Sequence, residues 1–312
     1  MMIMKLEEEI KKLKRRKNIA ILAHNYQIDE IQRIADIVGD SLELSLKSVK
    51  LDVDTIIFVG VKFMAEQVKV LNMKKKILMP DLGAICSLAH MISKEIVIEY
   101  KRKFPEAPLV IYVNAPTEIK ALADYVVTSA NAVDLVSKLD EDIILFGPDA
   151  NLADYVAQKT GKKVIPVPPT GHCYVHLLIT IHDVKKAKQK YPDAPIIVHP
   201  EVSREVRELA DYIGSTGQMI KIARNINAKR ILIGTETGMI YRLKREFPDK
   251  EFIPIVENAV CIGMKKNTPE KILYSLRNEV YEVDVKPSIA NSVRKAILRT
   301  FEVLGVKLQG FA

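Results

Sequence analysis

The chain has 312 residues, of which 48% are hydrophobic, and a formal net charge of +8. No segment reaches the roughly 18 apolar residues of a membrane span, and residues 1–18 lack the apolar stretch of a secretory signal. The three cysteines form no CxxC pair, which argues against a disulfide framework. We expect a soluble cytoplasmic protein with reduced cysteines and no membrane partner.

The positive charge does not predict a nucleic-acid partner. Lys and Arg are spread along the chain beside Asp and Glu, tryptophan is absent, and no basic run is interleaved with aromatic residues. We expect a solvated surface, on which excess positive charge near a site would attract an anionic substrate.

Strands and helices alternate in the first part of the chain. The hydrophobic pattern predicts strands at 18–24, 36–40, 54–60 and 75–80, with helices at 28–36, 41–51 and 62–72 between them. The order β-α-β-α-β-α-β predicts a parallel four-stranded sheet with helices on both faces.

The same pattern occurs twice more. Segments 22–41, 111–130 and 198–217 align, with Asp36, Asp124 and Asp211 in one slot. The strands that end at Gly60, Gly147 and Gly234 are followed by Cys86, Cys173 and Cys261 after 26, 26 and 27 residues. We therefore predict an α/β fold of three similar domains in a pseudo-threefold arrangement around a central site. The predicted domains are residues 1–90 plus 266–312, 91–178 and 179–265.

The C-terminal tail adds two predicted helices, at 268–279 and 289–304, around an extended segment at 280–285. We expect this tail to pack on the first domain beside an N-terminal helix.

Polar residues occupy equivalent strand ends, where parallel α/β sheets bind ligands. The first strand of each copy is followed by His24, Tyr112 or His199, and two residues later by Tyr26, Asn114 or Glu201. Ser41, Ser129 and Thr216 follow the second strands and are each expected to open a helix. A Ser or Thr there is ordinarily an N-cap, but three such helix starts favour a substrate with several carboxylates or phosphates.

One cysteine per copy predicts a shared metal centre. A lone cysteine is often a small packing residue, but the common phase of Cys86, Cys173 and Cys261 favours joint ligation. Three thiolates suit either zinc or an iron-sulfur cluster, with one position left for water or substrate. The spacing alone leaves both metals open.

The chain resembles the quinolinate synthase family in seven segments, which occur in the same order as in that family. They are residues 23–45, 60–72, 79–91, 171–176, 198–219, 233–243 and 260–272. The resemblance implies condensation of iminoaspartate with dihydroxyacetone phosphate to quinolinate, phosphate and two waters, in de novo NAD biosynthesis. It also implies a 4Fe-4S cluster held by Cys86, Cys173 and Cys261, whose open iron acts as a Lewis acid in dehydration. An aspartate oxidase or dehydrogenase that supplies iminoaspartate is a further implied partner.

The resemblance implies substrate contacts from residues of all three copies. We predict that Tyr26, Glu201 and His199 form the catalytic group. The implied substrate-binding residues are His24, Ser41, Tyr112, Asn114, Ser129, His176, His199, Glu201 and Thr216. We hypothesise that Glu201 moves protons during isomerisation and ring formation and that Tyr26 acts as acid or base in a dehydration.

Two other functions remain open at this level. The chain could be an iron-sulfur sensor without turnover, or a zinc hydrolase or lyase. Glu236 could reach the cavity from a strand end, whereas His90, His172 and His182 lack threefold counterparts and are expected to be surface or packing residues.

Overall fold

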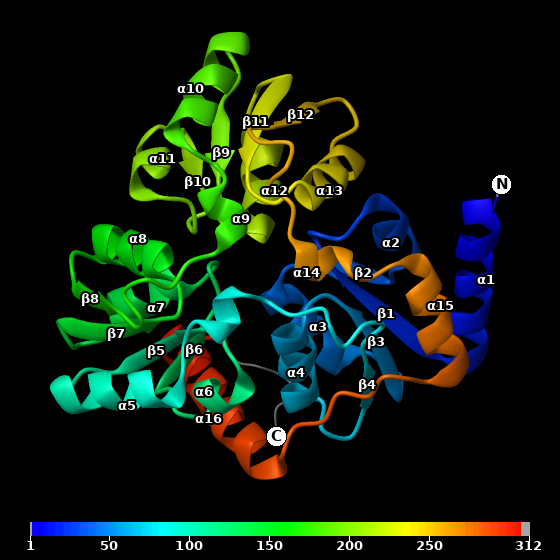
Figure 1. The fold of residues 1–312 in the computed structure, drawn as a ribbon, viewed down its shortest axis with the longest axis horizontal. Helices are drawn as coiled ribbons and strands as arrows, with labels where there is room; N and C mark the ends of the chain where they lie inside the picture. Colours follow the sequence, from blue (N-terminus) through cyan, green and yellow to red (C-terminus); the bar gives the residue numbers. More distant parts are fainter. Residues whose placement is uncertain (1, 307–312) are drawn as a thin grey trace.

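The computed structural model describes residues 2–306 and contains three four-stranded sheets in which every strand is parallel to its neighbours (Figure 1). The strand orders β2-β1-β3-β4, β6-β5-β7-β8 and β10-β9-β11-β12 repeat one topology three times. Helices flank each sheet, and the three lobes surround a common centre in Figure 1. The predicted α/β class is confirmed; the arrangement fits a pseudo-threefold, and the domain boundaries stay predictions.

The first copy follows the predicted order of elements. It comprises α1 (Met2–Lys17), β1 (Ile19–His24), α2 (Asp29–Ile34), β2 (Ile37–Gly39), α3 (Ser41–Lys50), β3 (Thr55–Val59), α4 (Lys62–Leu71), β4 (Lys76–Leu78) and the short η1 (Leu88–His90). The second comprises α5 (Lys94–Lys103), β5 (Leu109–Tyr112), α6 (Thr117–Lys120), β6 (Tyr125–Val127), α7 (Ala132–Lys138), β7 (Ile143–Gly147), α8 (Ala150–Thr160), β8 (Lys163–Pro166) and α9 (Tyr174–Leu177).

The third copy and the tail complete the chain. They comprise α10 (Ile181–Lys190), β9 (Ile196–Val198), α11 (Arg204–Glu208), β10 (Tyr212–Ile213), α12 (Thr216–Asn225), β11 (Arg230–Gly234), α13 (Gly238–Glu246), β12 (Glu251–Pro254), α14 (Ile262–Lys265), α15 (Pro269–Asn278) and α16 (Pro287–Val303).

Strand β1 shows why the central strands are continuous apolar runs. All six of its residues are buried, and it pairs with both β2 and β3, with Leu22 opposite Ile37 and Phe58. A parallel strand covered by helices on both faces has no solvent side, so it needs no polar alternation. Phe58 and Phe146 belong to one apolar cluster, so the first and second copies share a core.

The aspartates that recur in one slot have a structural role. A side-chain oxygen of Asp36, Asp124 and Asp211 accepts a hydrogen bond from a backbone N–H fifteen residues earlier, in the first strand of its own copy, at 2.8 Å each time. These carboxylates accept from backbone N–H groups of the first strands, so their recurrence is explained by the fold and not by ligand binding.

The tail packs differently from our prediction. Helix α15 lies against α1, as expected, but α16 packs mainly on β6 and α6 of the second copy, with a smaller contact to α4 of the first copy. Buried Thr300 accepts a hydrogen bond from Val126 N at 3.1 Å and lies 3.0 Å from Val126 O, on edge strand β6. The expectation was wrong for α16 because an amphipathic pattern shows that a helix buries one face, but not against which partner.

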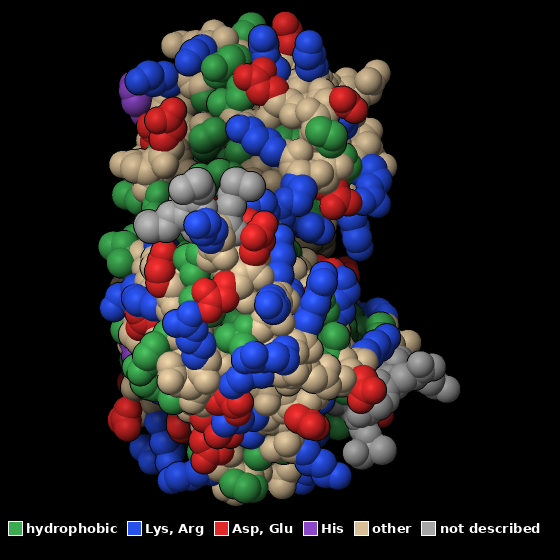
Figure 2. Space-filling view, turned by 90° about the vertical axis from the view of Figure 1, so that its right-hand side faces the viewer, with side chains coloured by type: hydrophobic (Ala, Val, Ile, Leu, Met, Phe, Trp, Pro, Cys, Tyr) green, Lys and Arg blue, Asp and Glu red, His purple; other side chains and the backbone are tan. Residues whose placement is uncertain are grey.

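The face in Figure 2 carries interspersed basic and acidic side chains, in keeping with the expected mixed surface. Across residues 2–306, every helix is too short or too polar to cross a membrane.

Candidate active site and metal centre

One cavity brings the predicted site residues together. It lies where the carboxyl ends of the first strands meet and has a volume of about 70 Å³. Its lining includes every predicted site residue: His24, Tyr26, Ser41, Cys86, Tyr112, Asn114, Ser129, Cys173, His176, His199, Glu201, Thr216 and Cys261. Glu236 also lines it, whereas His90, His172 and His182 do not. The strand-end argument thus identified a set of residues that share one space.

The three helix starts differ from the simple expectation. Ser41 and Thr216 are the first residues of α3 and α12, but the caps are Asp40 and Ser215, whose side chains accept from the N–H three residues on. Ser129 lies in a turn, because Asn131 Oδ1 accepts from Thr128 N at 2.8 Å and α7 begins only at Ala132. The prediction that Ser129 opens a helix was therefore wrong, although its side chain still faces the cavity.

Two histidines occupy equivalent positions with equivalent hydrogen bonds. Nδ1 of His24 accepts from Tyr26 N at 3.1 Å, and Nδ1 of His199 accepts from Glu201 N at 3.3 Å. Neutral rings that accept at Nδ1 carry their proton on Nε2, and His199 Nε2 lies 3.2 Å from Ser129 Oγ. Burial lowers the pKa of both histidines to about 3, with the Lys265 cation adding to the effect on His24. Both are therefore neutral donors at physiological pH.

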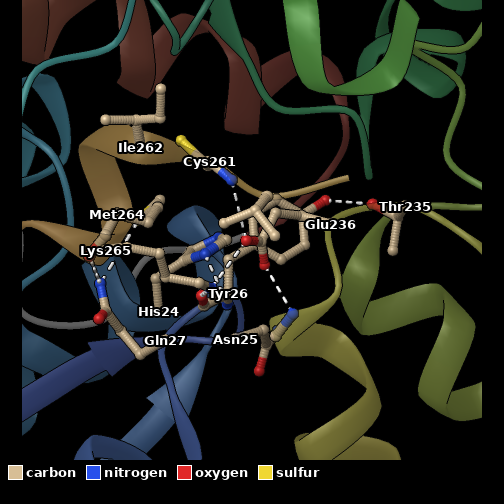
Figure 3. A network of polar contacts seen from close by, with 12 residues as sticks. His24, Asn25, Tyr26, Gln27, Thr235, Glu236, Cys261, Ile262, Met264 and Lys265 are labelled. Carbon is tan, nitrogen blue, oxygen red and sulfur yellow. Dashed lines mark hydrogen bonds and ion pairs between the residues drawn. The ribbon is translucent and has the colours of Figure 1, made fainter. Parts of the chain in front are cut away.

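A chain of polar contacts crosses the cavity wall. The Tyr26 hydroxyl lies 2.6 Å from Thr235 Oγ1, which lies 2.9 Å from His176 Nε2 (Figure 3 shows the tyrosine and threonine). The other ring nitrogen of His176 is 2.8 Å from Glu201 Oε2. Burial alone would raise the pKa of Glu201, but His176, His199 and the Tyr112 hydroxyl together lower it to about 2. The glutamate is therefore a buried carboxylate.

Tyr26 and Tyr112 are the phenols of the cavity. Burial, reinforced by the Glu201 charge, raises the pKa of both well above its usual value. They are therefore protonated donors at neutral pH, facing a carboxylate that can accept from a substrate. Among the described residues, Glu201 Oε1 is buried and accepts no hydrogen bond.

Thr235 was missed by the sequence analysis. The residue after the strand-end glycine is Val61 in the first copy and Pro148 in the second, so the repeat gives no signal for a polar residue there. Its hydroxyl becomes informative only once Tyr26 and His176, from two other copies, are seen on either side of it.

The cysteines reach the cavity from three different copies. Burial raises the pKa of all three thiols, that of Cys86 to about 12. Thiolates at this position therefore require a bound cation to hold them in the charged form. A second set of donor atoms, from Cys173, His176 and Glu201, lies within 4.8 Å of one another and is a possible metal-binding group.

Comparisons with known proteins agree with this site. The family model described as quinolinate synthetase A protein matches residues 8–302. The chain is 55% identical over 300 residues to the quinolinate synthase of Pyrococcus abyssi, covering 96% of this chain and all of that protein. It is 52% identical over 298 residues to that of Thermotoga maritima, covering 96% of this chain and 99% of the other. A match over nearly the whole length shows the family: the chain belongs to the quinolinate synthetase A proteins.

Proposed function

We propose that the chain is a quinolinate synthase of de novo NAD biosynthesis, condensing iminoaspartate with dihydroxyacetone phosphate to quinolinate, phosphate and two waters. The observation that carries the proposal is the single cavity in which three cysteines, one from each copy, face a chain of acid and base groups. Family membership supplies the product, and the residue types fit two small anionic substrates.

The donor set supports a 4Fe-4S cluster as the cofactor. Cys86, Cys173 and Cys261 would hold it, and three thiolates are the ligands such clusters use. A tetrahedral zinc with bonds of about 2.3 Å would draw its sulfurs to within about 4 Å of each other. Among residues 2–306, the three sulfur atoms do not form a set within 4.8 Å, which favours a larger group. When bound, the cluster supplies a Lewis acid for dehydration through its uncommitted iron.

The Cys173, His176 and Glu201 group is a weaker zinc site. His176 Nε2 lies 2.9 Å from Thr235 Oγ1, and its Nδ1 lies 2.8 Å from Glu201 Oε2, so a metal ion would have to enter between these two side chains. A zinc hydrolase would have to break the polar chain, which makes it the second candidate.

The neutral donors of the cavity suit the substrates. Iminoaspartate carries two carboxylates and the triose a phosphate, and we propose that the Nε2–H groups of His24 and His199 donate to these anions. Ser41 and Thr216, at the starts of α3 and α12, add side-chain hydroxyls to the cavity wall. Because the wall is otherwise largely apolar, these few donors fix the orientation of the substrate.

Glu201 is the proposed base and Tyr26 the proposed acid. Glu201 is ionised and has an oxygen without a partner, which places that oxygen to take a proton from a substrate carbon. Tyr26 is protonated and can give a proton to a departing hydroxyl. Thr235 and His176 connect the two, so a proton taken at one end can be replaced at the other without water.

The test is anaerobic. Purified protein should be brown, contain iron and sulfide rather than zinc, and form quinolinate from the two substrates. Glu201→Gln should keep the cluster and lose turnover on the order of a hundredfold or more, as expected for a proton-transfer group. A colourless, zinc-loaded protein would favour the hydrolase, and an intact cluster without quinolinate formation would favour the sensor.

A further inference from the structure

In each copy, an equivalent backbone hydrogen bond joins the loop that carries the cysteine to the loop after the third strand. The N–H of Lys62, Ala150 and Thr237 donates to the carbonyl two residues before the cysteine of its copy, at 2.8, 2.8 and 3.0 Å. When the copies are aligned on this bond, the second and third have one residue more than the first after the strand-end glycine. The extra residues are Asp149 and Glu236.

Each extra residue is a buried carboxylate that holds a cysteine. Asp149 Oδ2 accepts from Cys173 N at 3.2 Å, and Glu236 Oε1 accepts from Cys261 N at 3.0 Å (Figure 3). Both side chains are 0% exposed. Within residues 2–306, no carboxylate accepts from the N–H of Cys86, in keeping with the shorter loop of the first copy.

The second carboxylate oxygen holds the start of a helix. Asp149 Oδ1 accepts from Leu152 N and Glu236 Oε2 accepts from Gly238 N, each at 2.7 Å. Both oxygens therefore face N–H donors, and an amide in the same place would turn its own NH₂ towards one of them. Capping the helix alone would need only one oxygen, which leaves the bond to the cysteine as a separate role.

Glu236 also joins the cysteine loop to the first copy. Its Oε1 lies 2.7 Å from Lys265 Nζ, and Lys265 in turn donates to the carbonyl of Tyr26. The loop of Cys261 is thus fixed relative to the tyrosine that we propose as the acid (Figure 3).

We propose that Asp149 and Glu236 are positioning residues of the cysteine centre, each fixing the backbone of one cysteine so that its sulfur is directed into the shared cavity. This inference rests on the proposed cluster. Burying two carboxyl groups is costly, and the N–H groups of Cys173 and Cys261 offset part of this cost. Cys86 depends on other contacts, so the three ligands are not held equally.

The test replaces each carboxylate by its amide and compares it with a matched control. Glu236→Gln and Asp149→Asn should release iron from the reconstituted cluster to a chelator on the order of tenfold faster than the parent. The controls Asp211→Asn and Asp124→Asn lie in the same copies and remove a carboxylate bonded to a strand N–H. These controls should release iron at the parent's rate, and Glu236→Asp, which keeps a carboxylate, should release it more slowly than Glu236→Gln.

Backbone hydrogen exchange of the full, metal-free chain measures how well each cysteine loop is held, and this measurement does not depend on cluster assembly. Exchange should rise over residues 259–265 only in Glu236→Gln, and over residues 171–177 only in Asp149→Asn. The proposal would be overturned if both amide variants released iron and exchanged hydrogen as the parent does. It would also be overturned if the control variants released iron as fast as the amide variants, or if Glu236→Asp and Glu236→Gln released it at equal rates. A parent chain that assembles no cluster would instead overturn the proposed function, and exchange would still decide the positioning role.

Discussion

The polar chain at the cavity joins single residues from different parts of the sequence. Tyr26 lies after β1, His176 in α9, and Thr235 and Glu201 after β11 and β9. Each contact therefore depends on how the copies pack against one another. The Thr235 hydroxyl, in the middle of this series of polar contacts, connects Tyr26 with His176.

Thr235→Val should remove the link between Tyr26 and His176 without changing the side-chain shape. We expect kcat to fall by about a hundredfold with little change in KM, because binding groups such as His24 are untouched. Thr235→Ser restores the hydroxyl and should recover most of the rate. Steady-state assay of quinolinate formation checks this, and equal activity of the valine and serine variants would contradict a role for the hydroxyl.

The buried imidazoles predict acid sensitivity of the metal-free chain. His24 has a pKa of about 3 when folded and an ordinary value of 6.5, so between these values the unfolded chain binds a proton that the folded chain does not. Its contribution to stability is complete above pH 6.5 and is lost as pH falls towards 3, by up to about 1.4 kcal/mol per pH unit. Denaturant unfolding at several pH values measures the slope.

His24→Asn keeps a side-chain acceptor for Tyr26 N and should flatten that slope by about one proton. The exposed His182→Asn should leave it unchanged. A slope in the His24 variant equal to that of the parent would show that this histidine is not buried in the neutral form.

At the scale of elements, the sequence predicted secondary structure best where a hydrophobic pattern fits only one kind of packing. The run at 18–24 predicted β1 because a short, mostly apolar run is typical of a strand that is covered on both faces. The helix start expected at Ser129 was wrong because Asn131, three residues from Thr128, closes a local turn that the alignment of copies does not reveal. The partner of α16 and the role of Thr235 could not be predicted, because both depend on contacts between distant segments.

Thr300→Val tests the packing of α16 on the second sheet. The hydroxyl is fully buried and is the side-chain partner of both backbone groups of Val126, so we expect a loss of about 1–3 kcal/mol in the free energy of unfolding. Ser292→Ala, at an exposed site on the same helix, is the control and should cost little. Chemical denaturation checks this, and equal stability of the two variants would mean that α16 does not support the sheet edge.

At the scale of the whole molecule, three copies of one unit form a site that none of them contains alone. Each contributes one cysteine and a set of strand-end polar residues, and the cavity lies where they meet. The repeat in the sequence predicted this sharing because equal spacing places equivalent residues at equivalent strand ends. The proposed metal and substrates rest on the family and on the donor set of the cavity.

The most direct test is stepwise anaerobic reconstitution of the metal-free chain with iron and sulfide, with quinolinate formation measured at each step by mass spectrometry. The account predicts no turnover without iron, a rate that rises with cluster content until each chain holds one 4Fe-4S cluster, and no recovery in Cys261→Ala. Quinolinate formed at the same rate by the metal-free chain, or none formed by a chain with a full cluster, would contradict it.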